Sequence, residues 1–211
     1  MNVDSGLQTH RPKDSQTHMY LFLPFFTAVF TPFALTQTEK LKWRFMLTCL
    51  PVSIVFAVNL FNSQMSLPGN FKAMLINLSF IVFTAGIALF FRAVSGKRVV
   101  FAQFASTALI LFFSFSVFWI NPLIEAYRNS PVRDTLIYIA VNLNPMVTAY
   151  AHGYGADMLR QKLMYDISLI GPYYPYHVAG LFTIILSYLV PGAVLTALSC
   201  LKYKSASHAE V

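Results

Sequence analysis

The chain has 211 residues, of which 56% are hydrophobic and only 11% are charged, and its formal net charge is +7. Soluble globular domains carry about 25% charged residues, so this composition argues against a soluble domain and indicates a membrane protein. The basic residues stand singly or in small groups beside apolar runs, where they orient helices and meet lipid head groups, so we expect no binding to nucleic acid.

Polar residues are concentrated at the two ends of the chain. Residues 1–18 contain almost no apolar side chains and are predicted to form a flexible polar tail, and residues 205–211 a second one. The sequence between them, residues 19–204, is predicted to form a single membrane domain.

The first apolar run, residues 19–36, contains Pro24 and Pro32. Eighteen residues at about 1.5 Å each only just cross a hydrocarbon core of about 30 Å. Each proline also removes a backbone hydrogen bond. The run therefore predicts either a kinked span or an interfacial hairpin that lies on one leaflet, and we favour the interfacial alternative.

Four further apolar runs predict membrane spans. They are bounded by charged or turn-forming residues, such as the basic cluster around Trp43 and the Pro68-Gly69 pair, and the longest has 22 residues without a charge. The fold class is therefore all-α, a multi-pass helical membrane bundle. The four predicted spans are residues 45–62, 74–91, 99–120 and 178–201.

A helix over residues 135–150 is interrupted by Asn142, Asn144 and Pro145. The residue before a proline avoids helical geometry, and unpaired backbone groups in lipid cost several kcal/mol each. We therefore predict a broken helix that packs within protein or lines a cavity, and that either crosses the membrane or re-enters the leaflet from which it came.

Charge counting limits the topologies. If residues 19–36 are interfacial and 135–150 re-enters, ten Lys and Arg lie on the cytoplasmic side and five on the other, as the positive-inside bias requires. A full crossing by 135–150 gives the same ratio with the C-terminus outside, so the count does not separate these two. If both segments cross, the count is seven against eight and orients nothing. We favour the re-entrant arrangement, which places the C-terminus in the cytoplasm.

No enzyme motif is present: the chain lacks Gly-x4-Gly-Lys-Ser/Thr, Gly-x-Ser-x-Gly, His-Glu-x-x-His and Cys-x-x-Cys. We therefore predict no catalytic activity and no cofactor. His152 and His177 flank one loop and could ligate a haem or a metal, but hydrogen-bonding or interfacial histidines are the simpler interpretation.

Charged and aromatic residues are dense between residues 119 and 177. Glu125 and Arg128 are three residues apart, so they would form a surface pair or orient an amphipathic segment at the exit of a translocation path. The Tyr-rich run 171–176 is typical of an aromatic belt at the lipid boundary. A second amphipathic helix on the membrane surface is predicted from Asp157, Arg160, Lys162 and Asp166.

Two Asn-Pro pairs are each followed by an arginine: Asn121-Pro122 by Arg128, and Asn144-Pro145 by Arg160. In this, and in the order of its elements from Phe45 to Lys204, the chain resembles the permease subunits of type-2 ATP-binding-cassette exporters. That family has an Asn-Pro…Arg element in short re-entrant or amphipathic helices between its fifth helix and a final helix with a basic tail. It also has six full spans, more than the four predicted here with two further segments.

The resemblance implies a permease-like subunit in the plasma (inner) membrane, surrounded by lipid, that works in an oligomer or hetero-complex with a separate ATPase chain. It also implies that replacing Asn144 and Pro145 with leucine changes transport more than folding. The alternatives are a structural subunit of a larger membrane complex, such as an energy-transducing assembly, and a haem-bearing redox protein. The candidate residues for the substrate path or its gate are Asn121, Pro122, Glu125, Arg128, Asn144, Pro145 and Arg160.

Overall fold

The structure, a computed structural model, describes residues 19–36, 41–61, 65–96, 98–160, 167–171 and 173–208. Over these ranges every regular element is a helix, and the only β-type pairing is one isolated bridge between Ile170 and Tyr174. The all-helical class predicted from the sequence is therefore confirmed for the described residues. The predicted tail at residues 1–18 lies outside them.

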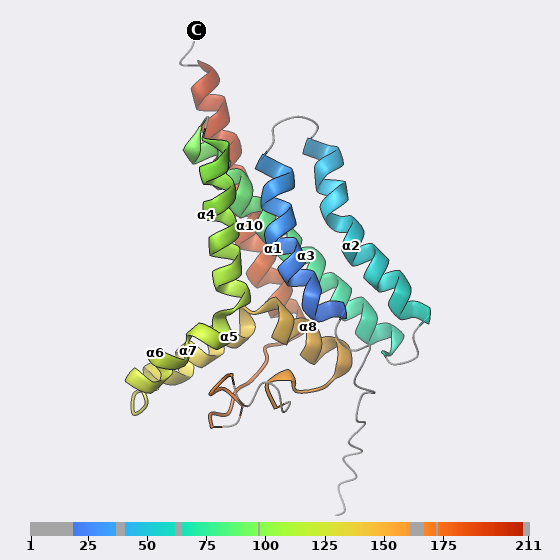
Figure 1. Cartoon of the computed structure of the whole chain (residues 1–211), viewed down its shortest axis with the longest axis vertical. Helices are drawn as coiled ribbons and strands as arrows, with labels where there is room; N and C mark the ends of the chain where they lie inside the picture. The colour runs from blue at the N-terminus through green and yellow to red at the C-terminus, as the bar shows by residue number, and fades with distance from the viewer. Residues whose placement is uncertain are drawn as a thin grey trace, which may run out of the picture.

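Five long helices run up and down beside one another and form a bundle (Figure 1). The central one is α3, which contacts each of the other four. Its most apolar stretch is 56% buried, against 17% for that of α10. The five helices are α1 (Met19–Thr36), α2 (Leu41–Phe61), α3 (Leu67–Ser95), α4 (Val99–Ser114) and α10 (Leu181–His208).

Within the described ranges, two helices have the length and hydropathy of membrane spans: α3, and α10 over Leu181–Lys202. Large apolar side chains such as Phe61, Phe104 and Phe182 are also exposed on the outside of the bundle, which is unusual for a soluble monomer. Both observations support a membrane location. The apolar parts of α1, α2 and α4 are shorter than 18 residues, so the four predicted spans are not all established.

Residues 19–36 form one helix that contains both prolines, so the predicted hairpin is wrong. This helix, α1, packs along α2, α3 and α4 as a member of the bundle. At its end the hydroxyl of Thr36 donates to the carbonyl of Pro32 at 2.7 Å, which satisfies a backbone group inside the helix.

Helix α3 is longer than the predicted span 74–91 because the Pro68-Gly69 pair belongs to its first turn and not to a loop. Ser66 is the N-cap, and its Oγ accepts a hydrogen bond from Gly69 N at 3.2 Å. A proline in the first helical turn has no N–H to leave unpaired, so it fits this start. Helix α10 likewise continues past residue 201 to His208, into the predicted tail.

Helices α3 and α10 approach each other closely where two glycines face each other. A Cβ atom on Gly86 would lie 2.5 Å from the carbonyl oxygen of Gly192. Small residues let membrane helices approach until their backbones touch. One turn or two away, the rings of Phe80 and Tyr188 pack edge to face with centroids 5.4 Å apart.

The predicted span 99–120 is wrong, since α4 ends at Ser114. The helical chain is interrupted at Phe115, which has φ −105° and ψ 17°. In a continuous helix the carbonyl of Ser114 would accept from residue 118, but here it accepts from the side chain of Asn144 at 2.7 Å. Phe118 N bonds to Phe115 O instead. A distant side chain therefore takes over the carbonyl and stabilises the break.

Candidate functional site: the helical cap between α4 and α10

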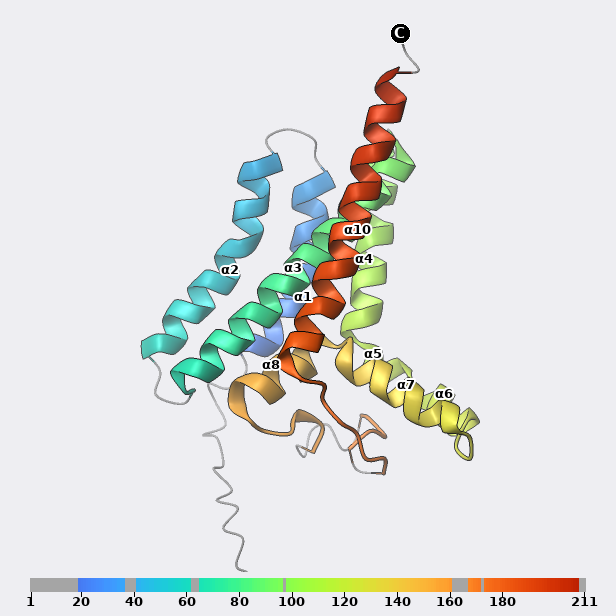
Figure 2. The same cartoon turned by 180° about the vertical axis from the view of Figure 1, so that it is seen from behind.

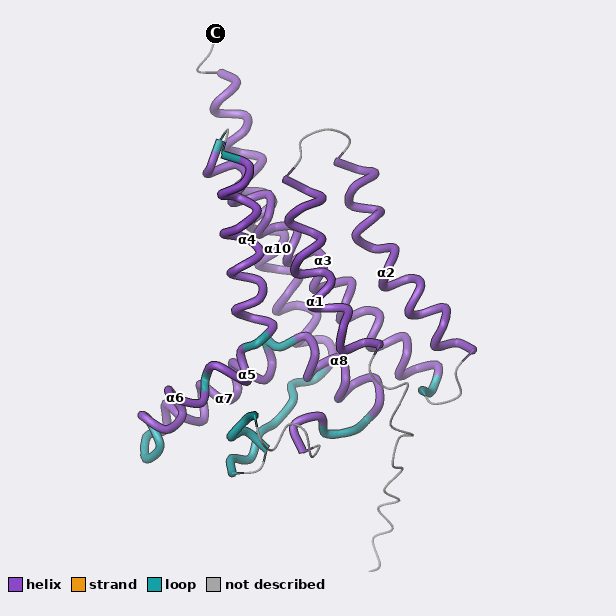
Figure 3. Tube along the Cα trace, viewed as in Figure 1, coloured by secondary structure: helices purple, strands orange, loops and turns teal. Residues whose placement is uncertain are grey.

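The described residues between 115 and 180 form a layer at one end of the bundle, which we call the cap. It lies at the end of the bundle opposite the C-terminal end of α10. Its helices α6 and α7 project sideways from the bundle (Figures 1 and 2). The loops of the structure are concentrated in it (Figure 3). Its elements are α5 (Ser116–Trp119), α6 (Asn121–Ala126), α7 (Pro131–Asn142), α8 (Pro145–Tyr154) and the 3-10 turn η1 (Met158–Arg160).

The cap has its own hydrophobic core, which includes Ile124, Ile137, Tyr150, Leu159 and Ile170. Tyr154 and Val178 pack against this core and also against the core of the bundle, so they join the two layers. Burial, with a smaller contribution from the neighbouring Tyr150, raises the pKa of Tyr154 to about 12. A neutral phenol suits its place between two apolar cores.

The predicted break in the segment 135–150 is confirmed. Helix α7 ends at Asn142 and α8 begins at Pro145. Between them, Oδ1 of the fully buried Asn144 accepts hydrogen bonds from Met146 N at 3.0 Å and Val147 N at 3.1 Å, and so caps α8. Its Nδ2 donates to Ser114 O at the end of α4. One side chain therefore satisfies the backbone at two helix ends.

We call an asparagine whose side chain bonds to the backbone of two segments a bracket, so Asn144 is the first bracket. Asn142 is a second one, between α7 and the segment that leads into α10. Its Nδ2 donates to the carbonyl oxygens of Tyr138 at 2.9 Å and His177 at 3.2 Å. Its Oδ1 accepts from Ala179 N at 2.7 Å. The interrupted helix thus holds the chain in place just before α10 begins.

Asn121 forms the third bracket. Its Nδ2 donates to Ile167 O at 3.0 Å, and its Oδ1 accepts from Leu169 N at 3.1 Å. Nearby, the buried hydroxyl of Ser168 donates to Val117 O at 3.0 Å. These bonds fix the described segment 167–171 against α5 and α6.

Glu125 and Arg128 do not form the predicted pair. Helix α6 ends at Ala126, so Arg128 lies in the turn beyond it and not on a shared helical face. Glu125 Oε1 instead accepts from the hydroxyl of Tyr174 at 3.3 Å, and the carbonyl of Arg128 accepts from Arg133 Nη1 at 2.9 Å. The guanidinium of Arg133 also lies 5.3 Å from the centroid of the Tyr174 ring.

Asp157 organises the turn η1. Its Oδ1 accepts from the backbone N of Leu159 and Arg160 and from the hydroxyl of Tyr176. Its Oδ2 lies 3.2 Å from Nε of Arg160 in an ion pair. The predicted amphipathic helix that begins here continues into residues 161–166, outside the described residues.

The Tyr-rich run 171–176 is only in part an aromatic belt. Tyr173 is 72% exposed, as a belt requires, but Tyr174 is buried in the cap core and Tyr176 is bonded to Asp157. The prediction is therefore wrong for Tyr174, which faces inward to Glu125 and Arg133.

The two histidines, His152 and His177, lie in the same part of the cap, and each takes part in a hydrogen bond that involves a backbone carbonyl group. His152 Nε2 lies 2.9 Å from Ala179 O, while His177 is exposed and its carbonyl is bound by Asn142. Within the described ranges no group of three or more His, Cys, Asp or Glu residues could hold a metal ion.

The seven candidate residues are spread over the cap and do not meet at one point. Asn121 and Pro122 begin α6, which carries Glu125. Asn144 is buried at the start of α8 with Pro145, whereas Arg128 and Arg160 are exposed in turns. Sequence reasoning missed the bracketing role of Asn142 and the inward position of Tyr174; for Asn142, its place two residues before Asn144 in the broken segment was the available signal.

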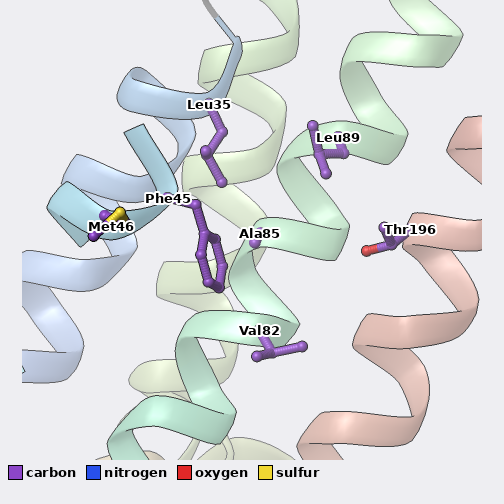
Figure 4. Close-up of a pocket in the computed structure, with 7 residues that line it drawn as sticks. All are labelled: Leu35, Phe45, Met46, Val82, Ala85, Leu89 and Thr196. Carbon is purple, nitrogen blue, oxygen red and sulfur yellow. The ribbon is translucent and has the colours of Figure 1, made fainter. Parts of the chain in front are cut away.

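The larger hollows of the described bundle are apolar. One lies between α1 and α4 and is lined mainly by phenylalanine and valine, and another lies beside α3 (Figure 4). A polar hollow in the cap is formed by the turn Glu125–Ser130.

No family model, no curated protein and no solved structure matches this chain.

Proposed function

We propose that the chain is a permease-like membrane subunit of an ATP-dependent exporter and that it has no catalytic activity of its own. The observation that carries this proposal is the course of the chain through the cap. Over the described residues, the chain leaves α4 at one end of the bundle, forms four short helices and a turn at that end, and then enters α10 (Figures 1 and 2). A layer of short helices before a final long helix is what the exporter resemblance leads us to expect.

The distribution of charge supports one orientation. Among the described residues, all three acids, Glu125, Asp134 and Asp157, lie in the cap, together with Arg128, Arg133 and Arg160; Lys72, near the start of α3, lies at the same end. The opposite end carries no acid in the described ranges, and its basic residues are Lys42, Arg44, Arg92, Arg98, Lys202 and Lys204. By the positive-inside bias, the end of α10 faces the cytoplasm and the cap faces outward.

In this arrangement the cap covers the outer end of the bundle. The broken helix fits such a position because the side chains of Asn142 and Asn144 bond to backbone groups within the protein on both sides of the break. The polar hollow at Glu125–Ser130 would lie on the outer surface. Energy for transport would come from a nucleotide-binding chain at the basic end.

The test is to purify the tagged full chain from its native membrane in mild detergent and to assay it for a stoichiometric nucleotide-binding chain and for ATP hydrolysis. The proposal requires both. Co-purification of a multi-subunit oxidoreductase, or of no nucleotide-binding chain, would refute it. A plain lipid-embedded protein of similar size from the same membrane is the control for carry-over.

A structural subunit of a larger membrane complex is the second candidate. It is favoured by the use of Asn121, Asn142 and Asn144 as brackets, because these polar groups are then not free to bind a solute. The apolar walls of the two bundle pockets also favour a structural subunit, because they offer few polar groups to a solute. The composition of the purified complex separates the two functions.

A further inference from the structure

One pocket of the bundle combines an apolar interior with a cationic end. It has a volume of about 520 Å³ and lies between α2, α3 and α10, with the end of α1 above it (Figure 4). Small-molecule sites have volumes of about 300–1,000 Å³. Its walls are almost wholly apolar and are formed by Leu35, Phe45, Met46, Val82, Ala85, Leu89 and Thr196.

The single polar side chain in this wall is already satisfied within its own helix. The hydroxyl of Thr196 donates to Gly192 O at 2.8 Å. The pocket therefore offers no free hydrogen-bonding group to a polar solute, and its interior suits a hydrocarbon chain. Two of the lining residues, Leu35 and Ala85, belong to a small buried apolar cluster with Ala88.

Arg92 lies one turn beyond Leu89 on the same face of α3, since residues 85, 89 and 92 follow helical spacing. Its Nη1 donates to Gly96 O, but its Nε is buried and has no hydrogen-bond partner among the described residues. Neither of the two ion pairs found in these residues involves Arg92. A partly buried guanidinium is thus left without an anion at the end of an apolar pocket.

The rest of this end is also basic. Lys42 and Arg44 occupy the first turn of α2, directly before the pocket residues Phe45 and Met46. No acidic residue occurs in the described parts of α2, α3, α4 and α10. A ligand that fits both features has a hydrocarbon chain for the pocket and a negative head group for Arg92.

We infer that this pocket binds one anionic glycerophospholipid of the cytoplasmic leaflet, with an acyl chain between α2, α3 and α10 and its phosphate at Arg92. The site rests on the membrane location and orientation proposed above but not on export. It differs from general attraction of anionic lipid to a basic surface because it needs both the cavity and the one unpartnered guanidinium.

Trp43 provides the test, since it is 67% exposed and lies two residues before Phe45. The full chain is placed in phosphatidylcholine vesicles in which dibrominated phosphatidylglycerol or dibrominated phosphatidylcholine replaces part of the lipid, and quenching of tryptophan fluorescence is followed. Trp119→Phe leaves Trp43 as the only reporter and keeps a ring stacked on Phe112. Because one basic contact near the surface contributes about a fivefold preference, phosphatidylglycerol should bind about five times more tightly.

Two matched pairs of variants, made in the Trp119→Phe chain, separate a site from diffuse attraction. Arg92→Gln should reduce the preference to about one, whereas Arg98→Gln, at the same end, should keep it, and Arg92→Lys should restore it. Thr196→Phe fills the pocket and should abolish the preference, whereas Ala197→Phe adds the same ring to the exposed neighbour on α10 and should not.

The inference is overturned if both lipids quench equally, if Arg98→Gln loses as much preference as Arg92→Gln, or if Thr196→Phe has no effect. Quenching of Trp43 by neither lipid would instead refute the membrane location itself. The result is independent of any ATPase partner, so failure of the lipid site leaves the exporter proposal standing, and the reverse also holds.

Discussion

The bracket at Asn144 makes a quantitative prediction about stability. In Asn144→Ala, α8 loses its N-cap, because the N–H groups of Met146 and Val147 lose their acceptor. The buried carbonyl of Ser114 also loses its donor. Loss of a cap costs about 1 kcal/mol, and an unsatisfied buried polar group about 1–3 kcal/mol. We therefore expect the free energy of unfolding to fall by about 3 kcal/mol.

Two further variants divide this loss. Asn144→Ser keeps an acceptor for the cap but removes the donor to Ser114, so it should show only the second part of the loss, about 1–3 kcal/mol. Asn129→Ala, in the exposed turn between α6 and α7, should change stability by less than about 0.5 kcal/mol. Reversible unfolding in mixed micelles, followed by the fluorescence of Trp119 beside the break, measures all three.

A loss below about 1 kcal/mol in Asn144→Ala, or one equal to that of Asn129→Ala, would refute the bracket. The same geometry changes the expectation for the double leucine variant of Asn144 and Pro145. Both residues are buried at the start of α8, so we now expect this variant to impair folding before transport can be measured.

Two other predictions follow from the packing and the orientation. Gly69→Ala should destabilise the protein by about 1–3 kcal/mol, because its Cβ would lie 2.1 Å from Gly153 O. Gly180→Ala places its Cβ where no atom lies within 4 Å, so this variant should be nearly neutral. Thermal unfolding in detergent compares the two variants, and equal unfolding midpoints would contradict the close approach of α3 and α8. In the proposed orientation Cys200 faces the cytoplasm and Ser130 faces outward. In intact cells, the exposed Cys200 should therefore resist a membrane-impermeant thiol reagent, whereas Ser130→Cys should be labelled. Labelling of Cys200 from outside would contradict the orientation.

Features set by neighbouring residues could be predicted from the sequence. The helix break at Asn144 is one, because an Asn-Pro pair removes a backbone donor and supplies a cap within three residues. The helical class is another, since long apolar runs in lipid have few alternatives.

Features set by distant residues could not be predicted. The end of α4 depends on Asn144, which is 30 residues away, so the uncharged run 99–120 gave no sign of it. Glu125 was paired with Arg128 on the assumption of a helix that in fact ends at Ala126, and its actual partner, Tyr174, is 49 residues further on.

The prediction for the proline-containing segment 19–36 was wrong for a different reason. Its length and its two prolines are compatible with lying on a leaflet, and only the surfaces that α3 and α4 offer place it in the bundle. A single sequence does not show those surfaces.

The three asparagine brackets also impose an order of assembly. They join residues 30 to 48 positions apart, and two of them depend on the segment between Ile167 and Ala179. While the chain is being synthesised, α4 and α7 are complete before their partners have been made. Until then, the carbonyl at the end of α4 and the side-chain amide at the end of α7 lack these hydrogen bonds. Such long loops close slowly. The cap is thus complete only after residues 167–179 have been made, and a chain that stops before Ile167 would lack the backbone partners of Asn121 and two of those of Asn142.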